Sequence, residues 1–367
     1  RGADPGGGAG GAALGVSDLR PGLREKAAEL LERHWHEAGF TVPHPQIYPW
    51  RWLWDSCFHS LVWLELGDER ALTELESVFR WQHADGFVPH IGYEGGSADH
   101  AFWGRSDAST LTQPPMYGHA VAALRAGGVD VPAELAERAA AGVEWILRRR
   151  RRDDGRVVIV HPWESGCDDS PRWDAWCPGP GWDRSRWYER KGELVRALRL
   201  DGHGAAVGSS EFEVDSAGFN ALVAFNAAAL GIDHGIPWSA PSDPGWALTV
   251  DDLLVTLAWD APGLLDLALD ATAFGGTYGP AGVRRDHPAF DPDGYWRGAA
   301  WPHLTYLLWL AARRAGRTDV AHGLADAAVR GVVRSGWAEH WNPDTGEGGG
   351  ARPHSWSTVV LPMAADL

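Results

Sequence analysis

The sequence predicts an all-α fold in which helical hairpins form an α/α barrel with long loops at one mouth. Apolar residues at helical spacing recur along the 367-residue chain. They mark about ten to twelve helices, joined by loops of very unequal length. Strand-like alternation is brief, as at Val157-Val158-Ile159-Val160. Strict sequence repeats are absent, which disfavours a regular solenoid.

The helical patterns follow one another from the N-terminal region to the C-terminus. The first runs from Leu23 to Trp35, and another follows Pro132, a residue suited to the first turn of a helix. Gly231 and Gly316 are predicted to end helices, because glycine adopts the left-handed conformation of a helix C-terminus easily. Further helices are predicted over residues 56–67, 70–82, 188–200, 212–231, 247–259, 262–271, 302–315 and 318–335.

The domain organisation follows from glycine content and from the absence of a linker. Residues 1–17 contain Gly6-Gly7-Gly8 and are expected to form a disordered tail. Nothing between 18 and 367 has the composition of a linker, so this range is expected to be one catalytic domain.

The charge balance excludes several classes of partner. A net charge of −16 argues against binding to nucleic acid or to an anionic membrane, which require clustered basic residues. The one basic run, Arg148 to Arg152, is interpreted as the solvated C-terminal end of a helix. No apolar run reaches the length of a membrane span. The sequence does not indicate an oligomeric state.

The three cysteines indicate the redox setting. Cys57, Cys167 and Cys177 fit neither a disulfide framework nor a CxxC metal motif. A reduced, cytoplasmic location is therefore expected.

Tryptophans and acidic residues gather in the long irregular segments. These segments are 40–55, 83–116, 155–186, 273–298 and 337–355. One mouth of an α/α barrel would bring them together. Aromatic faces stack on sugar rings, and carboxylates can protonate a glycosidic oxygen or activate water. The combination predicts an enzyme that cleaves carbohydrate.

The first such cluster runs from Tyr48 to Asp55. Trp50, Trp52 and Trp54 alternate along it, so Trp52 and Trp54 are expected on one side of an extended strand, beside the Asp55 carboxylate. The alternative is that Asp55 caps a helix and the tryptophans belong to the core.

The strongest cluster surrounds Asp168, in the segment WESGCDDSPRW. A general acid must keep its proton near neutral pH, and apolar neighbours or a second negative charge favour this. The alternative is that Asp169 caps a turn and Asp168 pairs with Arg172. A second candidate carboxylate, Glu339, precedes His340 near the C-terminus.

Three weaker signals lie in the other loops. Gln113, before two prolines, could bind sugar hydroxyls or only local backbone. Trp296 and Trp301 could close a sugar pocket or only pack the barrel top. The glycine-rich run from Gly346 to Gly350 is not a dinucleotide fingerprint, and we expect it to form a lid over the pocket.

Five segments together resemble a known family. YPWRWLWDS, QPPM, WESGCDDSPRW, YWRGAAWP and EHWNPDTGEG occur in the order found in glycoside hydrolase family 63, and most resemble its bacterial glucosylglycerate and mannosylglycerate hydrolases. The resemblance covers the chain from about residue 22. It implies an (α/α)6 barrel that hydrolyses an α-glycosidic bond with inversion, without metal or organic cofactor.

The resemblance also assigns roles to residues. It implies that Asp168 is the general acid and Glu339 the general base, and it ranks the rival carboxylates Asp169 and Glu347 below them. It places Tyr188, Tyr295 and Trp296 nearer the leaving group. It implies that the sugar-binding residues are Tyr48, Trp52, Trp54, Asp55, Gln113, Trp163, Gly166, Trp301 and Trp356.

Two positions depart from the family pattern. Trp182 stands where the glycerate-specific relatives carry an arginine, and His354 stands where they carry a glutamine. An anionic leaving group needs a positioned cation, which Arg184, Arg186 or Arg352 would have to supply. The sequence therefore leaves open the leaving group, and also whether the sugar is glucose or mannose.

Other classes of protein compete for the same residues. A sugar-binding protein without activity would need the tryptophans but not both acids, so Asp168 and Glu339 favour the enzyme. A terpene cyclase would carry repeated Gln-Trp motifs or a DxDD acid, which this chain lacks. No HExxH or GxSxG motif indicates metal or serine hydrolysis.

Overall fold

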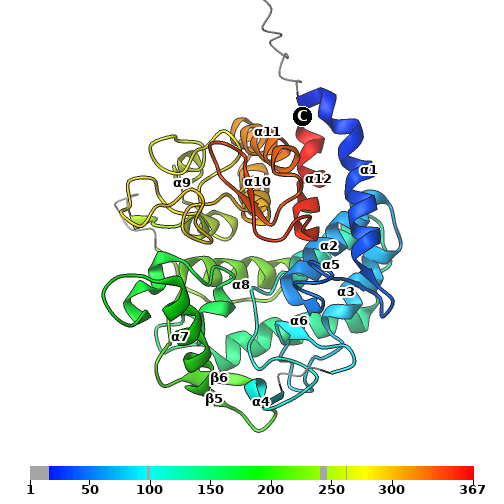
Figure 1. The fold of residues 1–367 in the computed structure, drawn as a ribbon. Coiled ribbons are helices and arrows are strands. Elements are labelled where there is room, and N and C mark those ends of the chain that lie inside the picture. Colours follow the sequence, from blue (N-terminus) through cyan, green and yellow to red (C-terminus); the bar gives the residue numbers. More distant parts are fainter. Residues whose placement is uncertain (1–15, 97–99, 240–245, 262) are drawn as a thin grey trace, which may run out of the picture.

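The computed structural model describes residues 16–96, 100–239, 246–261 and 263–367. The predicted tail therefore lies almost wholly outside the described residues. Helices dominate the described part of the chain, and its strands form four short antiparallel pairs (Figure 1). The prediction of a mainly helical fold is confirmed.

The elements have the following bounds. The α-helices are α1 (Val16–His34), α2 (Leu53–Leu66), α3 (Arg70–Val78), α4 (His100–Trp103), α5 (Tyr117–Ala126), α6 (Ala133–Arg149), α7 (Arg184–Arg196), α8 (Ala217–Ala229), α9 (Leu264–Leu267), α10 (Pro302–Arg314), α11 (Thr318–Ser335) and α12 (Val360–Met363). The 3-10 helices are η1 (Pro162–Ser165), η2 (Pro171–Trp176), η4 (Val250–Leu257), η5 (Ser355–Val359) and η6 (Ala364–Asp366). The paired strands are β1 (Trp35–His36) with β2 (Phe40–Thr41), β3 (Arg51–Trp52) with β4 (Ile91–Gly92), β5 (Leu198–Leu200) with β6 (Ala206–Ser209), and β7 (His340–Trp341) with β8 (Gly348–Gly349).

Helices buried on all sides alternate along the chain with helices buried on one side. Residues 53–63 of α2 and 218–227 of α8 are all buried. The helices that follow α2 and α5, namely α3 and α6, bury only one face. A helix that is apolar all round belongs in the interior, whereas a one-sided helix covers it. From α2 to α3 and from α5 to α6 the chain therefore passes from an inner to an outer layer.

The inner elements contact one another in a closed series. Helix α2 contacts α5, α5 contacts α8, α8 contacts η4, η4 contacts α10, α10 contacts η5, and η5 returns to α2. The outer helices pack on this series: α3 on α2 and α5, α6 on α5 and α8, and α11 on α10. Figure 1 shows α8 crossing the middle of the molecule and α1 running along its edge.

Several predicted helices have the expected bounds. Those at 56–67, 302–315 and 318–335 correspond to α2, α10 and α11. Gly231 and Gly316, with φ of 73° and 70°, follow the ends of α8 and α10 as predicted.

Other helix predictions were wrong in length or type. The pattern at 188–200 belongs to α7, which begins earlier, at Arg184, and ends at Arg196, because Leu198–Leu200 pair with β6 instead. The pattern at 247–259 forms the 3-10 helix η4, and that at 262–271 contains only the short α9. Helix α5 was not predicted, because its alanine-rich sequence is short and follows two prolines.

The basic run at the end of α6 is only partly solvated. Arg148 and Arg149 lie in the last turn, as predicted. Arg150 is instead buried, and its guanidinium donates to both carboxylate oxygens of Glu164, at 2.7 and 2.8 Å. The prediction was wrong at Arg150, because its partner lies fourteen residues further along the chain. Among the described residues, no helix has the length and apolarity needed to cross a membrane.

Candidate active site

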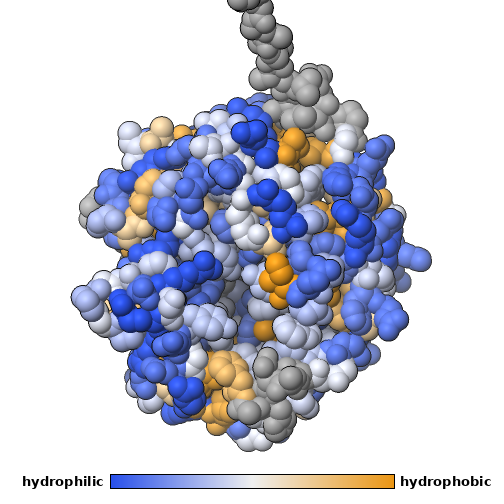
Figure 2. Space-filling model, in the orientation of Figure 1, coloured by the Kyte–Doolittle hydropathy of each residue, from blue (hydrophilic) through white to orange (hydrophobic). Residues whose placement is uncertain are grey.

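A cavity of about 880 Å³ opens among the loops. All five long irregular segments contribute to its lining, together with the first two turns of α7. Figure 2 shows this face of the molecule hollowed near its centre. The aromatic and acidic clusters therefore gather around one cavity.

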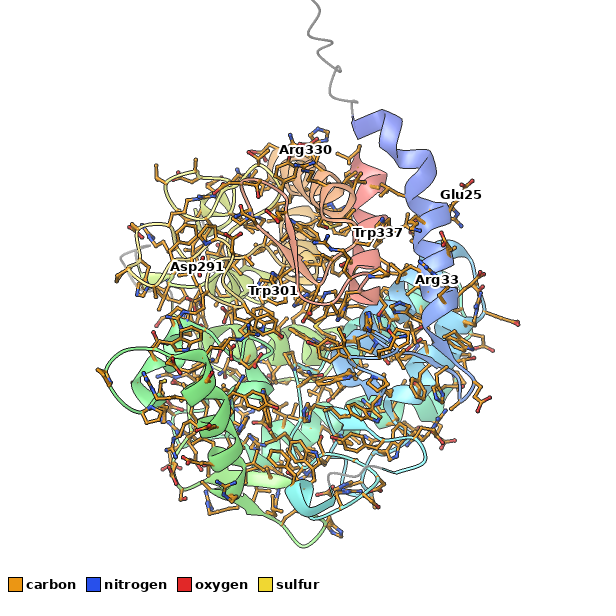
Figure 3. All side chains as sticks on the ribbon, in the orientation of Figure 1. Glu25, Arg33, Asp291, Trp301, Arg330 and Trp337 are labelled. Carbon is orange, nitrogen blue, oxygen red and sulfur yellow. The ribbon has the colours of Figure 1, made fainter. Side chains whose placement is uncertain are left out.

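The cavity contains nearly all of the predicted site residues. Those that line it are Tyr48, Trp52, Trp54, Asp55, Gln113, Trp163, Gly166, Asp168, Tyr188, Tyr295, Trp296, Glu339, His354 and Trp356. Trp301 does not line it. Its ring stacks on that of Trp296, with centroids 3.5 Å apart and planes 7° apart, and Figure 3 places Trp301 near the middle of the molecule.

Two unusual backbone conformations direct side chains at this site. Trp296 and Trp337 have φ of 58° and 62°, values that are rare for residues other than glycine. Trp296 lines the cavity in this conformation. Trp337 follows Gly336, which ends α11 with φ of 70°, and together they turn the chain so that Glu339 enters the cavity. Such strain is often stored at functional sites.

The Glu339 carboxylate is held by three donors. The Ala351 N–H donates to Oε2 at 2.8 Å, and the hydroxyls of Tyr48 and Tyr295 each donate to Oε1 at 3.3 Å. Burial raises the pKa of Glu339 to about 7, even though these three hydrogen bonds act to lower it. A carboxylate that titrates near neutral pH suits a general base.

The glycine-rich run lies beside Glu339. Strand β8 pairs with β7, and Gly349 and Gly350 line the cavity. A Cβ at Gly350 would lie 2.3 Å from Glu339 Oε2, so this position requires glycine. The rival carboxylate Glu347 is exposed and does not line the cavity.

Asp168 lies in a loop that closes against α7. The indole N–H of Trp187 donates to the Asp168 carbonyl at 2.9 Å. The Lys191 ammonium donates to Oδ2 of Asp168 and, at 2.6 Å, to Oδ1 of Asp169. The alternative in which Asp168 pairs with Arg172 is wrong, because Arg172 bonds to residues of the segment around η4 instead.

The second acid of the loop, Asp169, is more enclosed than the first. The side chain of Asp169 is 5% exposed and that of Asp168 is 18% exposed. Burial, and then the charge of Asp168, raise the pKa of Asp169 to about 6. Both carboxylates line the cavity.

The base of this loop is fixed by the buried carboxylate of Glu164. Besides its ion pair with Arg150, the Glu164 carboxylate accepts hydrogen bonds from the backbone N–H groups of Thr112, at 3.2 Å, and Val160, at 2.8 Å. Further along, Gly166 has φ of 75°, and a Cβ there would lie 2.3 Å from the Trp54 ring. The loop that carries Asp168 therefore packs closely against Trp54.

The cluster at 48–55 differs from the expected strand. Strand β3 ends at Trp52 and α2 begins at Leu53, so Trp52 and Trp54 do not share one extended strand, although both line the cavity. Asp55 lies in the first turn of α2 and is not the N-cap, which is Trp52. Burial raises the pKa of Asp55 to about 8.

Gln113 has a structural role in addition to its place in the cavity. Its Oε1 accepts a hydrogen bond from the Trp54 backbone N–H at 3.4 Å. Gln113 therefore bonds to local backbone, as the alternative interpretation expected, and it also lines the cavity.

Several residues of the cavity were not singled out from the sequence. They include Tyr93, Trp103, Lys191, Asp293 and His340. A signal existed for Lys191, because it lies three residues after Tyr188 and therefore on the same face of α7. In the described part of the chain, no three His, Cys, Asp or Glu side chains are arranged to hold a metal ion.

This cavity, with its aromatic lining and carboxylates, defines the class of protein, a glycoside hydrolase. Comparison with known proteins specifies the family. Residues 48–232 and 254–357 match the mannosylglycerate hydrolase MGH1-like glycoside hydrolase domain, which is well over half of the chain. The chain belongs to this family.

Individual relatives are similar over nearly their whole length. The chain is 29% identical to a mannosylglycerate hydrolase of Thermus thermophilus, over 91% of this chain and 98% of the relative. It is also 29% identical to a glucosylglycerate hydrolase of Mycolicibacterium hassiacum, over 92% and 96%. The crystal structure of a family 63 mannosylglycerate hydrolase from Thermus thermophilus in complex with Tris and D-glycerate superposes with a TM-score of 0.76, at 28% identity, over 93% of this chain and 99% of that one.

Proposed function

We propose that this enzyme hydrolyses, with inversion, the α-glycosidic bond of a glucoside or mannoside whose leaving group is glycerate or a similarly small molecule. The observation that carries the proposal is the convergence of Asp168 and Glu339, 171 positions apart in sequence, on one aromatic cavity. The names of the relatives, mannosylglycerate hydrolase and glucosylglycerate hydrolase, support this choice of substrate.

Asp168 acts as the general acid. It donates its proton to the glycosidic oxygen while that oxygen leaves the anomeric carbon. Asp168 lines the same cavity as the exposed Tyr188, on the side formed by α7, so the leaving group faces this side.

Glu339 acts as the general base. Its Oε1 takes a proton from the water that attacks the opposite face of the sugar. The two tyrosine hydroxyls and the Ala351 N–H orient the carboxylate. The stacked aromatic walls and the cavity carboxylates stabilise the positive charge that develops on the ring.

An anionic leaving group requires a cation, and Arg184 is suitably placed. It lines the cavity, its side chain is 70% exposed, and its guanidinium lies 5.4 Å from the centre of the Tyr295 ring. The other two candidates are occupied outside the cavity lining: Arg186 donates to backbone carbonyls of residues 178–181, and Arg352 to that of Gly348. We therefore assign to Arg184 the binding of the anionic leaving group, because Trp182 has no positive charge.

The architecture proposed for this function is an (α/α)6 barrel that spans residues 18–367 as one catalytic domain. The closed series of α2, α5, α8, η4, α10 and η5 supports it. We also propose a reducing, cytoplasmic setting, which the three free and buried cysteines support.

A substrate panel tests the proposal. The wild-type enzyme is assayed on glucosylglycerate, mannosylglycerate, trehalose, kojibiose, nigerose and maltose. Hydrolysis of a glycerate glycoside is expected, and Arg184→Met should raise KM for it about tenfold, since a charge-assisted contact is lost. Arg186→Met is the matched control and should leave KM unchanged. Hydrolysis of none of the six would contradict the proposal.

A further inference from the structure

Lys191 is the only lysine among the described residues that line the cavity. The chain contains one other lysine, Lys26. All other formally basic residues are arginines. Lys191 is buried on α7, and its Nζ lies between two consecutive carboxylates, 2.6 Å from Asp169 Oδ1 and within hydrogen-bond distance of Asp168 Oδ2. A compact ammonium with three N–H donors can reach two neighbouring carboxylates in this way, whereas a planar guanidinium is less suited to it.

Resting on the function proposed above, we propose that Lys191 and Asp169 are positioning residues that orient Asp168 and together set the pH range in which it can act as general acid. The argument is one of charge balance in an enclosed place. One ammonium balances one carboxylate, and a second ionised carboxylate would leave a net negative charge there. Asp169 shares the Lys191 ammonium with Asp168, so the charge of Asp169 opposes ionisation of Asp168, while the ammonium favours it.

The same geometry serves the step after proton transfer. When Asp168 gives its proton to the glycosidic oxygen, it becomes a carboxylate, and the Lys191 N–H that already points at Oδ2 stabilises the new charge. The raised pKa of Asp169, caused by burial and then by the charge of Asp168, is consistent with two carboxyl groups that compete for one proton.

Other charged and titratable groups surround Lys191, Asp168 and Asp169. None of these other groups is substituted in the test described below. Arg184, from α7, lies 4.0 Å from Asp169 Oδ2, and the Arg297 guanidinium donates to the Asp169 carbonyl. Across the cavity lie the Glu339 carboxylate and the hydroxyls of Tyr48 and Tyr295. Burial raises the pKa of each of these groups, and the charge of Asp168 adds to the shift.

Opposite shifts of one limb of the pH profile test the proposal. The fall of kcat at high pH follows the loss of the proton from the general acid. Asp169→Asn leaves Lys191 with Asp168 alone and should move this limb down by about one pH unit or more, because an unshared positive charge favours the ionised acid. Lys191→Met removes the positive charge and should move the limb up by about as much.

The controls separate this role from a structural one. Lys26→Met removes the other lysine, which pairs with Glu29 on the exposed face of α1, and should leave the pH profile unchanged. A loss of stability alone would lower kcat without moving the limb. Unchanged limbs, or limbs that move in the same direction in both variants, would overturn the proposal.

One further variant distinguishes failure of this proposal from failure of the proposed function. Asp168→Asn should abolish hydrolysis if Asp168 is the general acid. An inactive Asp168→Asn with unmoved limbs in the other variants rejects only the role of Lys191 and Asp169. Full activity in Asp168→Asn would reject the function assigned to Asp168 itself.

Discussion

The two tyrosine hydroxyls on Glu339 should set the pH at which the enzyme becomes active. Each donates to Oε1 at 3.3 Å, longer than the usual O–H···O distance of about 2.7–2.8 Å. A hydrogen bond to a charged group contributes about 1.5–3 kcal/mol at good geometry, so we take about 1 kcal/mol for each of these. Dividing by about 1.36 kcal/mol per pKa unit gives a rise of about 0.7 unit for each hydroxyl removed.

The double variant Tyr48→Phe/Tyr295→Phe should therefore raise the pKa of Glu339 from about 7 by roughly 1.5 units. Because the base must be ionised to accept a proton, the rise of kcat/KM at acid pH moves to higher pH by the same amount. At pH 7 the ionised fraction of Glu339 should fall from about one half to a few per cent, roughly fifteenfold. The profile is measured on a glycerate glycoside, with Tyr188→Phe as a control that changes a tyrosine of the same cavity. An acid limb that stays in place, or moves to lower pH, would refute the reasoning.

Three further substitutions test other parts of the site. Gly350→Ala should lower kcat about 100-fold, because a Cβ at Gly350 would displace the Glu339 carboxylate. Gly316→Ala is the control: Gly316 has φ of 70° and Gly350 has φ of 71°, but a Cβ at Gly316 would meet nothing within 4 Å, so kcat should not change. Equal kcat in the two variants would contradict this. Glu164→Gln should reduce the free energy of unfolding by about 3–5 kcal/mol in urea, because it leaves the Arg150 charge buried without its partner; a change below about 1 kcal/mol counts against it. Asp55 binds its proton more tightly in the folded protein, where its pKa is about 8, than in the unfolded chain. Its contribution to the free energy of unfolding is therefore present at low pH and is lost as the pH rises from about 4 to 8. In urea titrations Asp55→Asn should flatten this decline of stability with pH, and an unchanged slope would contradict the reasoning.

Local patterns in the sequence predicted most of the fold. Helices such as α2 and α11 carry enough periodic apolar residues to be recognised alone. The pattern was misleading at Leu198–Leu200, where pairing with β6 replaces helical bonding, and over η4, because such competition depends on partners distant in the sequence.

The site was predictable wherever a residue type indicates its own chemistry. Trp54, Asp168 and Glu339 were found in this way. Trp301 was placed in the pocket, but it lies behind Trp296, because the order of two stacked rings is decided by the turn at Trp296 and not by residue type. Lys191 was missed because its importance comes from contact with a loop more than twenty residues earlier in the chain.

The most direct test of the central claim is the anomeric form of the sugar first released. Hydrolysis of glucosylglycerate and mannosylglycerate is followed by proton NMR, with wild-type enzyme and with Asp168→Asn and Glu339→Gln. The account predicts that wild-type enzyme releases the β-anomer first and that both variants release none. Initial release of the α-anomer, or wild-type rates in either variant, would contradict the roles proposed for Asp168 and Glu339.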